Sequence, residues 1–165
     1  GYTDGLGNPE AVQSPETEAV KNNTGLTLTG DGKNNTLVGK TGDDTLTGGL
    51  GKDTLTGGAG ADVFVYTSTK DSGTTTTTRD TITDFKHTDG DKLDLSAIDA
   101  NSKLSGDQAF TFIGTAAFST KDASAQLRFD AKAHILYGST NADSKPEFSI
   151  LLSGVSTLTA DDFVL

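Results

Sequence analysis

Apolar side chains recur every nine residues between positions 30 and 65, each standing two places after an acidic or amide residue. The four blocks of this repeat read GDGKNNTLV (30–38), GKTGDDTLT (39–47), GGLGKDTLT (48–56) and GGAGADVFV (57–65). Their eighth positions are Leu37, Leu46, Leu55 and Phe64, and their sixth positions are Asn35, Asp44, Asp53 and Asp62. A fixed period held without slip indicates a stack of short structural units.

Each block predicts a glycine-rich turn followed by a short strand. The last three positions, such as 54–56, have strand propensity, and alternation points the central leucine inward. One strand buries only one large side chain, so three or more blocks must stack to form a core. Two blocks make one coil, which places Asp44 above Asp62 and Asn35 above Asp53. The predicted fold is all-β, a right-handed parallel β-roll built as a nonapeptide solenoid.

The flanking sequence extends this roll and then changes character. Residues 21–29 keep the apolar ladder through Leu28 and predict a degenerate first coil. The threonine tract in 67–79 predicts an exposed inserted loop, after which 80–96 resume the repeat, so the roll spans 25–96. Residues 97–165 predict a small antiparallel sheet that caps the roll, because solenoid ends need covering. Its expected strands are 109–114, 125–130, 134–138, 147–153 and 162–165.

Residues 1–24 contain two prolines, several acidic residues and no usable period, which predicts a linker or the remnant of a preceding domain. Their first twenty residues resemble the last strand region of immunoglobulin-like repeats in large bacterial surface adhesins. Because methionine is absent even at position 1, we expect the chain to be a fragment of a longer protein.

Composition narrows the function. The chain is 33% hydrophobic, which suits a solenoid with a thin core, and its formal charge of −10 makes nucleic acid an unfavourable partner. No cysteine is present, which excludes disulfides and thiol catalysis. No segment is apolar enough for a transmembrane helix, and no N-terminal signal peptide is apparent.

The stacked acidic turns point to a metal. Carboxylates held about 5 Å apart by strand spacing repel each other, and a hard divalent cation between them removes the repulsion. Calcium takes six to eight oxygen ligands, which carboxylates and turn carbonyls supply. We therefore expect calcium binding to drive folding of the roll.

The blocks GGLGKDTLT and GGAGADVFV resemble RTX (repeats-in-toxin) calcium-binding repeats. The segments DTITDF (80–85), GDKLDLSAID (90–99), FTFIGTAAFS (110–119), AQLRFD (125–130) and SGVSTLTADDFVL (153–165) resemble the C-terminal domain of serralysin-type secreted metalloproteases. Related domains also occur on secreted lipases, alginate epimerases and giant adhesins. The resemblance covers residues 25–165 and implies export by a type I secretion apparatus, guided by an uncleaved C-terminal signal.

The resemblance also implies the calcium ligands. In that family one turn supplies the carbonyls of positions two and four and its Asp, and the turn eighteen residues on supplies the carbonyls of positions one and three and its own Asp. The first implied site contains Lys40, Gly42, Asp44, Gly57, Ala59 and Asp62. The second contains Asp31, Lys33, Asn35, Gly48, Leu50 and Asp53. The turns with Gly49, Gly51 and Asp53 and with Gly58, Gly60 and Asp62 need partners beyond the threonine loop, and Asp80 is the predicted partner of the latter turn.

Three departures from the family pattern bear on these sites. Asn35 replaces an aspartate, so the second site has one carboxylate fewer and should bind calcium more weakly. Lys33 and Lys40 replace glycines and bring ammonium groups near the metals, although each contributes only a carbonyl.

We expect a non-catalytic, monomeric calcium-binding module of a secreted bacterial protein, extracellular or associated with the cell surface. No HExxH is present, and neither His87 nor His134 stands in a zinc-binding or catalytic motif. The alternative is a calcium-dependent module for a polysaccharide or cell-surface component, as in an adhesin or an alginate epimerase. The net acidity of the chain argues against direct binding of alginate, and the sequence offers no basic or aromatic stripe for sugar contacts. The identity and activity of the parent protein stay open.

Overall fold

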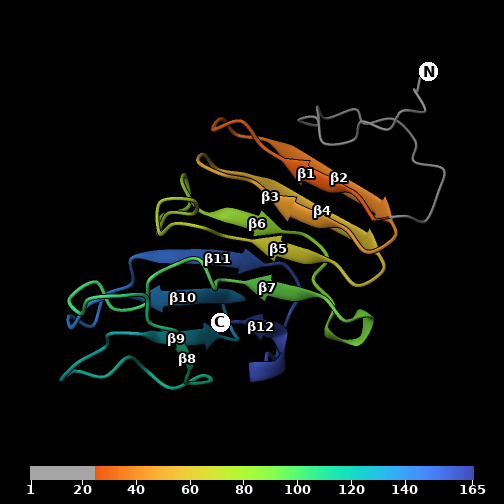
Figure 1. Ribbon diagram of the computed structural model, residues 1–165. Helices are drawn as coiled ribbons and strands as arrows, with labels where there is room; N and C mark the ends of the chain where they lie inside the picture. The colour runs from red at the N-terminus through yellow and green to blue at the C-terminus, as the bar shows by residue number, and fades with distance from the viewer. Residues whose placement is uncertain (1–24) are drawn as a thin grey trace.

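The computed structural model describes residues 25–165 as two β-sheets that face each other across a narrow interior (Figure 1). The predictions for residues 1–24, including the immunoglobulin-like resemblance, lie outside the described residues. The strands are β1 (Thr27–Thr29), β2 (Thr36–Thr41), β3 (Thr45–Thr47), β4 (Thr54–Ala59), β5 (Val63–Val65), β6 (Asp80–Ile82), β7 (Lys92–Asp94), β8 (Thr111–Phe112), β9 (Gln126–Asp130), β10 (Ile135–Ser139), β11 (Phe148–Leu152) and β12 (Phe163–Val164). Two short 3-10 helices, η1 (His87–Asp89) and η2 (Ala160–Asp162), complete the elements.

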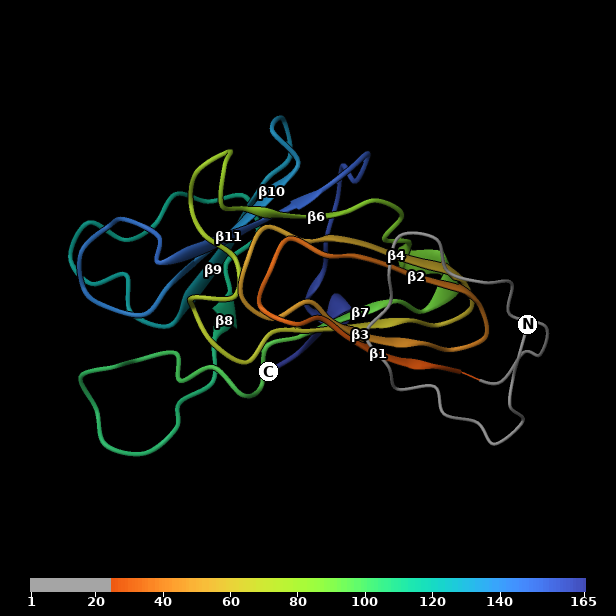
Figure 2. The same ribbon diagram turned by 90° about the horizontal axis from the view of Figure 1, so that it is seen from above.

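Consecutive strands of the roll alternate between the two sheets. The first sheet has the order β1-β3-β5-β7-β12, and the second has the order β2-β4-β6-β11-β10-β9-β8. All roll strands pair in parallel, with Leu28 beside Leu46 and Leu37 beside Leu55. The view from above shows the chain tracing superposed loops, one coil over the next (Figure 2). The predicted parallel β-roll with two blocks per coil is therefore confirmed.

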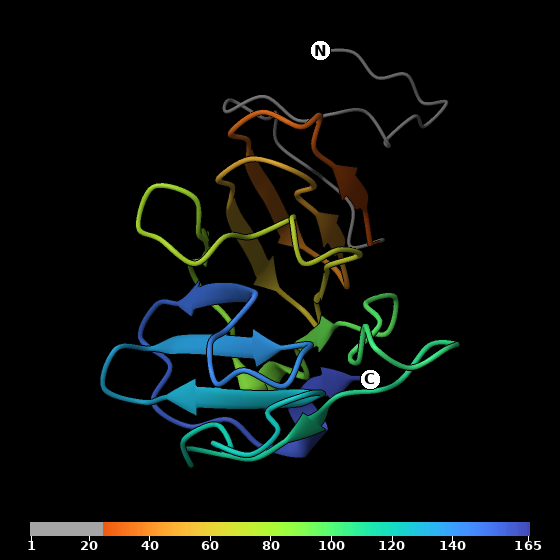
Figure 3. The ribbon, with the colours of Figure 1, turned by 90° about the vertical axis from the view of Figure 1, so that its left-hand side faces the viewer.

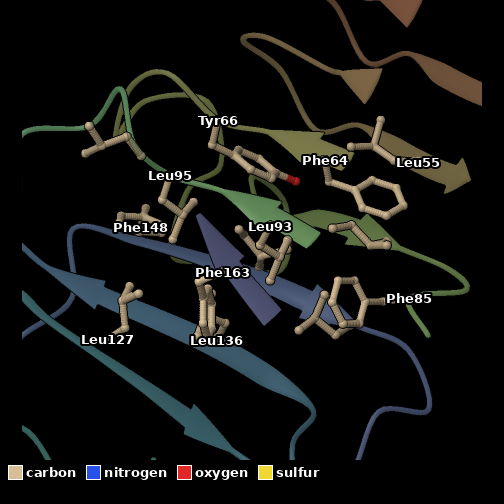
Figure 4. Packing of buried hydrophobic residues seen from close by; sticks show 14 of the residues in the cluster. Leu55, Phe64, Tyr66, Phe85, Leu93, Leu95, Leu127, Leu136, Phe148 and Phe163 are labelled. Carbon is tan, nitrogen blue, oxygen red and sulfur yellow. The ribbon is translucent and has the colours of Figure 1, made fainter. Parts of the chain in front are cut away.

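The interior is a ladder of single apolar residues, one from each strand. The side chains at the ladder positions have no exposed surface: Leu28, Leu37, Leu46, Leu55, Phe64, Ile82 and Leu93. Below the roll the ladder widens into an aromatic cluster with Tyr66, Phe85, Phe148 and Phe163 (Figure 4). Burial of these rings joins the roll and the cap in one core.

The cap differs from its prediction in how it joins the roll. Strands β9, β10 and β11 are antiparallel as expected, but β11 pairs in parallel with β6 and so continues the second sheet of the roll. β8 is parallel to β9, and β12 leaves the cap to pair in parallel with β7. This pairing satisfies the backbone groups at the edge of β7, which a separate cap would leave open. Figure 3 shows the coils standing on the cap strands.

The threonine loop is exposed at its tip but anchored at its base. Thr74 to Thr78 are exposed, whereas Asp71 and Ser72 are buried. Ser72 Oγ donates to the Ser149 carbonyl at 2.5 Å and accepts from the Asp80 N–H at 2.8 Å. The base of the loop therefore ties β6 to β11 at the junction of roll and cap.

Candidate metal centre

Aspartates stack at the starts of the roll strands, each fully buried and each bonded to the coil before it. Asp62 Oδ1 accepts from the Asp44 N–H at 2.9 Å, and Asp53 Oδ1 accepts from the Asn35 N–H at 2.7 Å. Asp44 Oδ1 accepts from the Leu26 N–H at 2.7 Å in the same way. The predicted stacking of residues eighteen positions apart is confirmed. In each pair, one carboxylate oxygen accepts a backbone hydrogen bond from the preceding coil.

The second oxygen of these carboxylates lacks a partner. Asp44, Asp53, Asp62 and Asp80 each bury an Oδ2 atom that accepts no well-formed hydrogen bond from residues 25–165, although the Tyr66 hydroxyl lies beside Asp80. Burial, the largest cause, raises the pKa of Asp53 to about 6, that of Asp62 to about 7 and that of Asp80 to about 8. A buried, unbonded carboxylate oxygen is costly, so these atoms call for a proton or a cation.

Backbone carbonyls converge on the same space. A Cβ placed on Gly39 would collide with Asp44 Oδ2 and would lie 2.6 Å from the Gly57 carbonyl oxygen. On the next turn, a Cβ on Gly58 would meet the Lys40 carbonyl, and a Cβ on Gly60 would meet the Gly42 carbonyl. Only glycine leaves this oxygen-lined space open, which fits a hard cation such as calcium.

The first implied site is thus brought together: the turns 39–44 and 57–62 face each other, with Lys40, Gly42 and Gly57 presenting carbonyls. Lys40 adopts a φ of 84°, the left-handed conformation that Gly49 and Gly58 take at the same position of the next two blocks. The carbonyl of Ala59 stays a predicted ligand.

The second implied site is assembled less completely. The Gly48 carbonyl approaches Gly30 beside Asn35 Oδ1, and the Lys33 carbonyl lies 2.5 Å from the Cβ position of Gly51. Asn35 Oδ1 also accepts from the Asp31 N–H at 3.0 Å, so the amide oxygen is already engaged. The weaker calcium binding of this site and the role of the Leu50 carbonyl both remain predictions.

The partner predicted for Asp80 is wrong. Asp80 Oδ1 accepts from the Asp53 N–H at 2.8 Å, and Asp91 Oδ1 accepts from the Asp62 N–H at 2.9 Å. Successive strands alternate between sheets, so β6 must follow β4, and Asp80 stacks with the turn of Asp53. Sequence reasoning missed Asp84, which accepts from the Gly57 and Gly58 N–H groups at 3.0 and 2.8 Å. The alternation of strands between the two sheets could have predicted that Asp91 stacks with Asp62.

A tyrosine also lies beside the carboxylates. Tyr66 is buried and its hydroxyl interacts with Asp80, so its pKa is raised first by burial and next by the Asp80 carboxylate. Figure 4 shows the Tyr66 ring within the buried cluster at the junction of roll and cap. The repeat pattern does not predict this hydroxyl, because Tyr66 follows the last block and precedes the inserted loop.

Residues 25–165 contain no cluster of three or more histidine and acidic side chains able to hold a metal. The oxygen-lined turns instead combine paired carboxylates with carbonyls. His87 Nδ1 lies 2.5 Å from Asp162 Oδ1, and His134 Nδ1 lies 2.6 Å from the Val155 carbonyl oxygen. Over the same residues, no helix has the length and apolarity needed to cross a bilayer.

A parallel roll with stacked aspartate turns defines a protein of the RTX type, and comparison with known proteins agrees. Residues 16–165 match the family described as Peptidase M10 serralysin C terminal, and the chain belongs to this family. That family is the non-catalytic C-terminal part of serralysin.

Among solved structures, the chain is similar to the AlgE6R3 subunit of the mannuronan C5-epimerase from Azotobacter vinelandii, determined in solution. The two share 25% identity with a TM-score of 0.57, over 96% of this chain and 86% of the other. A search of curated proteins gives no match. The predicted family and fold class are thereby confirmed, and the chain is an RTX module of a calcium-binding family.

Proposed function

We propose that this chain is a non-catalytic calcium-binding RTX module of a type I secreted bacterial protein, which folds when it meets extracellular calcium. The observation that supports the proposal is the unbonded, buried Oδ2 atom on each of four stacked aspartates. Without a cation these oxygens either take up protons or repel one another. With calcium, the energy of binding becomes energy of folding.

The residues that would hold calcium follow from the stacking. Asp44 and Asp62, with the carbonyls of Lys40, Gly42 and Gly57, form the first site. Asp53 would share a second ion with Asp80, and Asp62 a third with Asp91. When bound, calcium would supply the positive charge that lets ionised carboxylates lie buried together.

The position of the C-terminal segment fits the proposal that the module folds after export. Phe163 is buried and Val164 pairs with β7, so the segment that resembles a secretion signal is part of the folded domain. A secretion apparatus would need this segment unfolded. Sites of the extracellular class, with dissociation constants of about 10⁻⁴–10⁻³ M, are empty in the cytosol and saturated outside. The module would thus stay exportable until it leaves the cell.

The test is circular dichroism of the metal-free chain during titration with calcium. We expect strand signal to appear at millimolar calcium and to vanish on addition of a chelator. The double variant Asp44→Asn/Asp62→Asn should lose this response, while the charge-matched Asp107→Asn/Asp143→Asn, on exposed loops of the cap, should keep it. A strand signal that is indifferent to chelator in the unmodified chain would overturn the proposal.

A further inference from the structure

The outer face of the cap bears a pocket of about 470 Å³ that has no part in the metal turns. Its floor is formed by Arg128 and Asp130 of β9 and by Tyr137 of β10, which point away from the core on neighbouring strands. Tyr137 is the direct cross-strand neighbour of Arg128. Phe118, Thr120 and Ser144 complete the wall from two loops.

Arg128 is held in place by three contacts. Its Nε donates to the Ala116 carbonyl at 2.9 Å, and its guanidinium carbon lies 6.0 Å from the Phe118 ring centre and 5.7 Å from that of Tyr137. Its terminal amino groups have no hydrogen-bond partner among residues 25–165. The side chain thus offers a fixed, unpaired fork of donors, the geometry that binds a carboxylate in bidentate fashion.

Asp130 places an acceptor on the same face of β9. Its Oδ1 accepts from the Lys132 and Ala133 N–H groups at 3.0 Å, and these bonds, that of Ala133 first, lower the pKa of the carboxyl group. The pocket therefore combines a cationic fork, aromatic walls, hydroxyls at the rim and an anionic acceptor. A flat ligand with an apolar ring face, several hydroxyls and one carboxylate would satisfy all four features.

We propose that this pocket binds a uronate unit of an acidic polysaccharide, with the sugar carboxylate on Arg128 and sugar hydroxyls on Asp130. Saccharide binding at this pocket would be a second function beside calcium binding, of the kind that the sequence left open as an alternative. The sequence shows no basic or aromatic stripe because Phe118, Arg128 and Tyr137 lie about ten residues apart along the chain. These three side chains meet only when the cap folds.

The test is isothermal titration calorimetry of the calcium-loaded chain with trigalacturonate, which is too short to be crosslinked into a gel. The fully methyl-esterified trimer, with the same rings but no charge, is the matched ligand. We expect trigalacturonate to bind and the ester to bind at least about tenfold more weakly. Equal binding of the two trimers, or no binding of either at millimolar concentration, would overturn the proposal.

Variants locate the site. Arg128→Lys keeps the charge but removes the fork, and Tyr137→Ala removes one ring; each should weaken trigalacturonate binding about tenfold or more. Lys86→Gln, which removes an exposed cation on the roll, should leave binding unchanged. Circular dichroism in calcium checks that every variant folds. If trialanine, with its free terminal carboxylate, binds at Arg128 and the uronate does not, the pocket is a peptide site and the saccharide assignment is wrong.

Discussion

The Asp44 N–H donates to Asp62 Oδ1 at 2.9 Å, although eighteen residues separate the two aspartates. The same carboxylate leaves its Oδ2 without a partner. One oxygen of Asp62 therefore joins two coils, while the other faces the space lined by carbonyls. Removing the charge and removing the hydrogen bond are separable, because asparagine can keep the bond.

Asp62→Asn should weaken calcium binding without abolishing the fold in saturating calcium. Asparagine retains an acceptor for the Asp44 N–H but takes one negative charge from the site, and calcium affinity follows the ligand charge. We expect the calcium midpoint to rise about tenfold, or about 1.4 kcal/mol. Calorimetric titration measures it, with Asp107→Asn as the control on an exposed loop. An unchanged midpoint would show that Asp62 is not a ligand.

Gly39→Ala should block the first calcium site through volume alone. The added methyl group would occupy the space beside Asp44 Oδ2 and the Gly57 carbonyl, and Gly39 does not have a positive φ that alanine would strain. The control is Gly32→Ala, where φ is +91° and no atom lies within 4 Å of the new Cβ. That variant should lose about 1–2 kcal/mol of stability to backbone strain but keep its calcium stoichiometry. Equal stoichiometry in both variants would contradict the site.

The metal-free fold should be more stable at pH 5 than at pH 8. Burial raises the carboxyl pKa from 3.8 to about 6 in Asp53, about 7 in Asp62 and about 8 in Asp80. The folded metal-free chain therefore holds more protons than the unfolded chain, and its stability falls as pH rises through these values.

Circular dichroism of the resin-stripped chain between pH 5 and pH 8 measures this trend: the strand signal that is lost without calcium near neutral pH should be partly regained toward pH 5. In saturating calcium the carboxylates are held ionised, so the decline with pH should disappear or reverse. A metal-free chain that gains stability toward pH 8 would contradict the assignment of these buried groups.

Leu46→Ala should destabilise the calcium-loaded roll by about 2–5 kcal/mol, because Leu46 has no exposed surface and its ladder neighbours cannot close the cavity. The matched variant is Leu50→Ala, whose side chain is 53% exposed in the adjacent turn. Its effect should stay within about 0.5 kcal/mol. Denaturant midpoints in excess calcium compare the two, and similar losses would mean that the ladder is not the core.

The roll could be predicted from sequence because its contacts repeat a local rule. Once Leu46 and Leu55 are placed on alternating strands, the period fixes every neighbour up to Phe64. The rule ends at Asp80, where the inserted loop changes the offset between stacked aspartates from eighteen residues to 27. The eighteen-residue period therefore assigns Asp80 to the wrong turn.

The way in which the cap joins the roll escaped prediction for a different physical reason. The alternation in β11 identifies a strand, but nothing in residues 148–152 says that β6, far earlier in the chain, is its partner. That pairing depends on the aromatic packing of the finished core. The same holds for Arg128, whose two aromatic neighbours come from separate segments.

The second sheet runs without a break from β2 through β4 and β6 into β11, so the two ends of the roll differ in what covers them. In a solenoid each coil is stabilised by its neighbours, so opening begins at a free end. One end of this stack is fused to the cap, and β1 is the outermost strand at the other end of its sheet. Within residues 25–165, amide exchange in the roll should therefore be fastest around β1 and slow progressively toward β6.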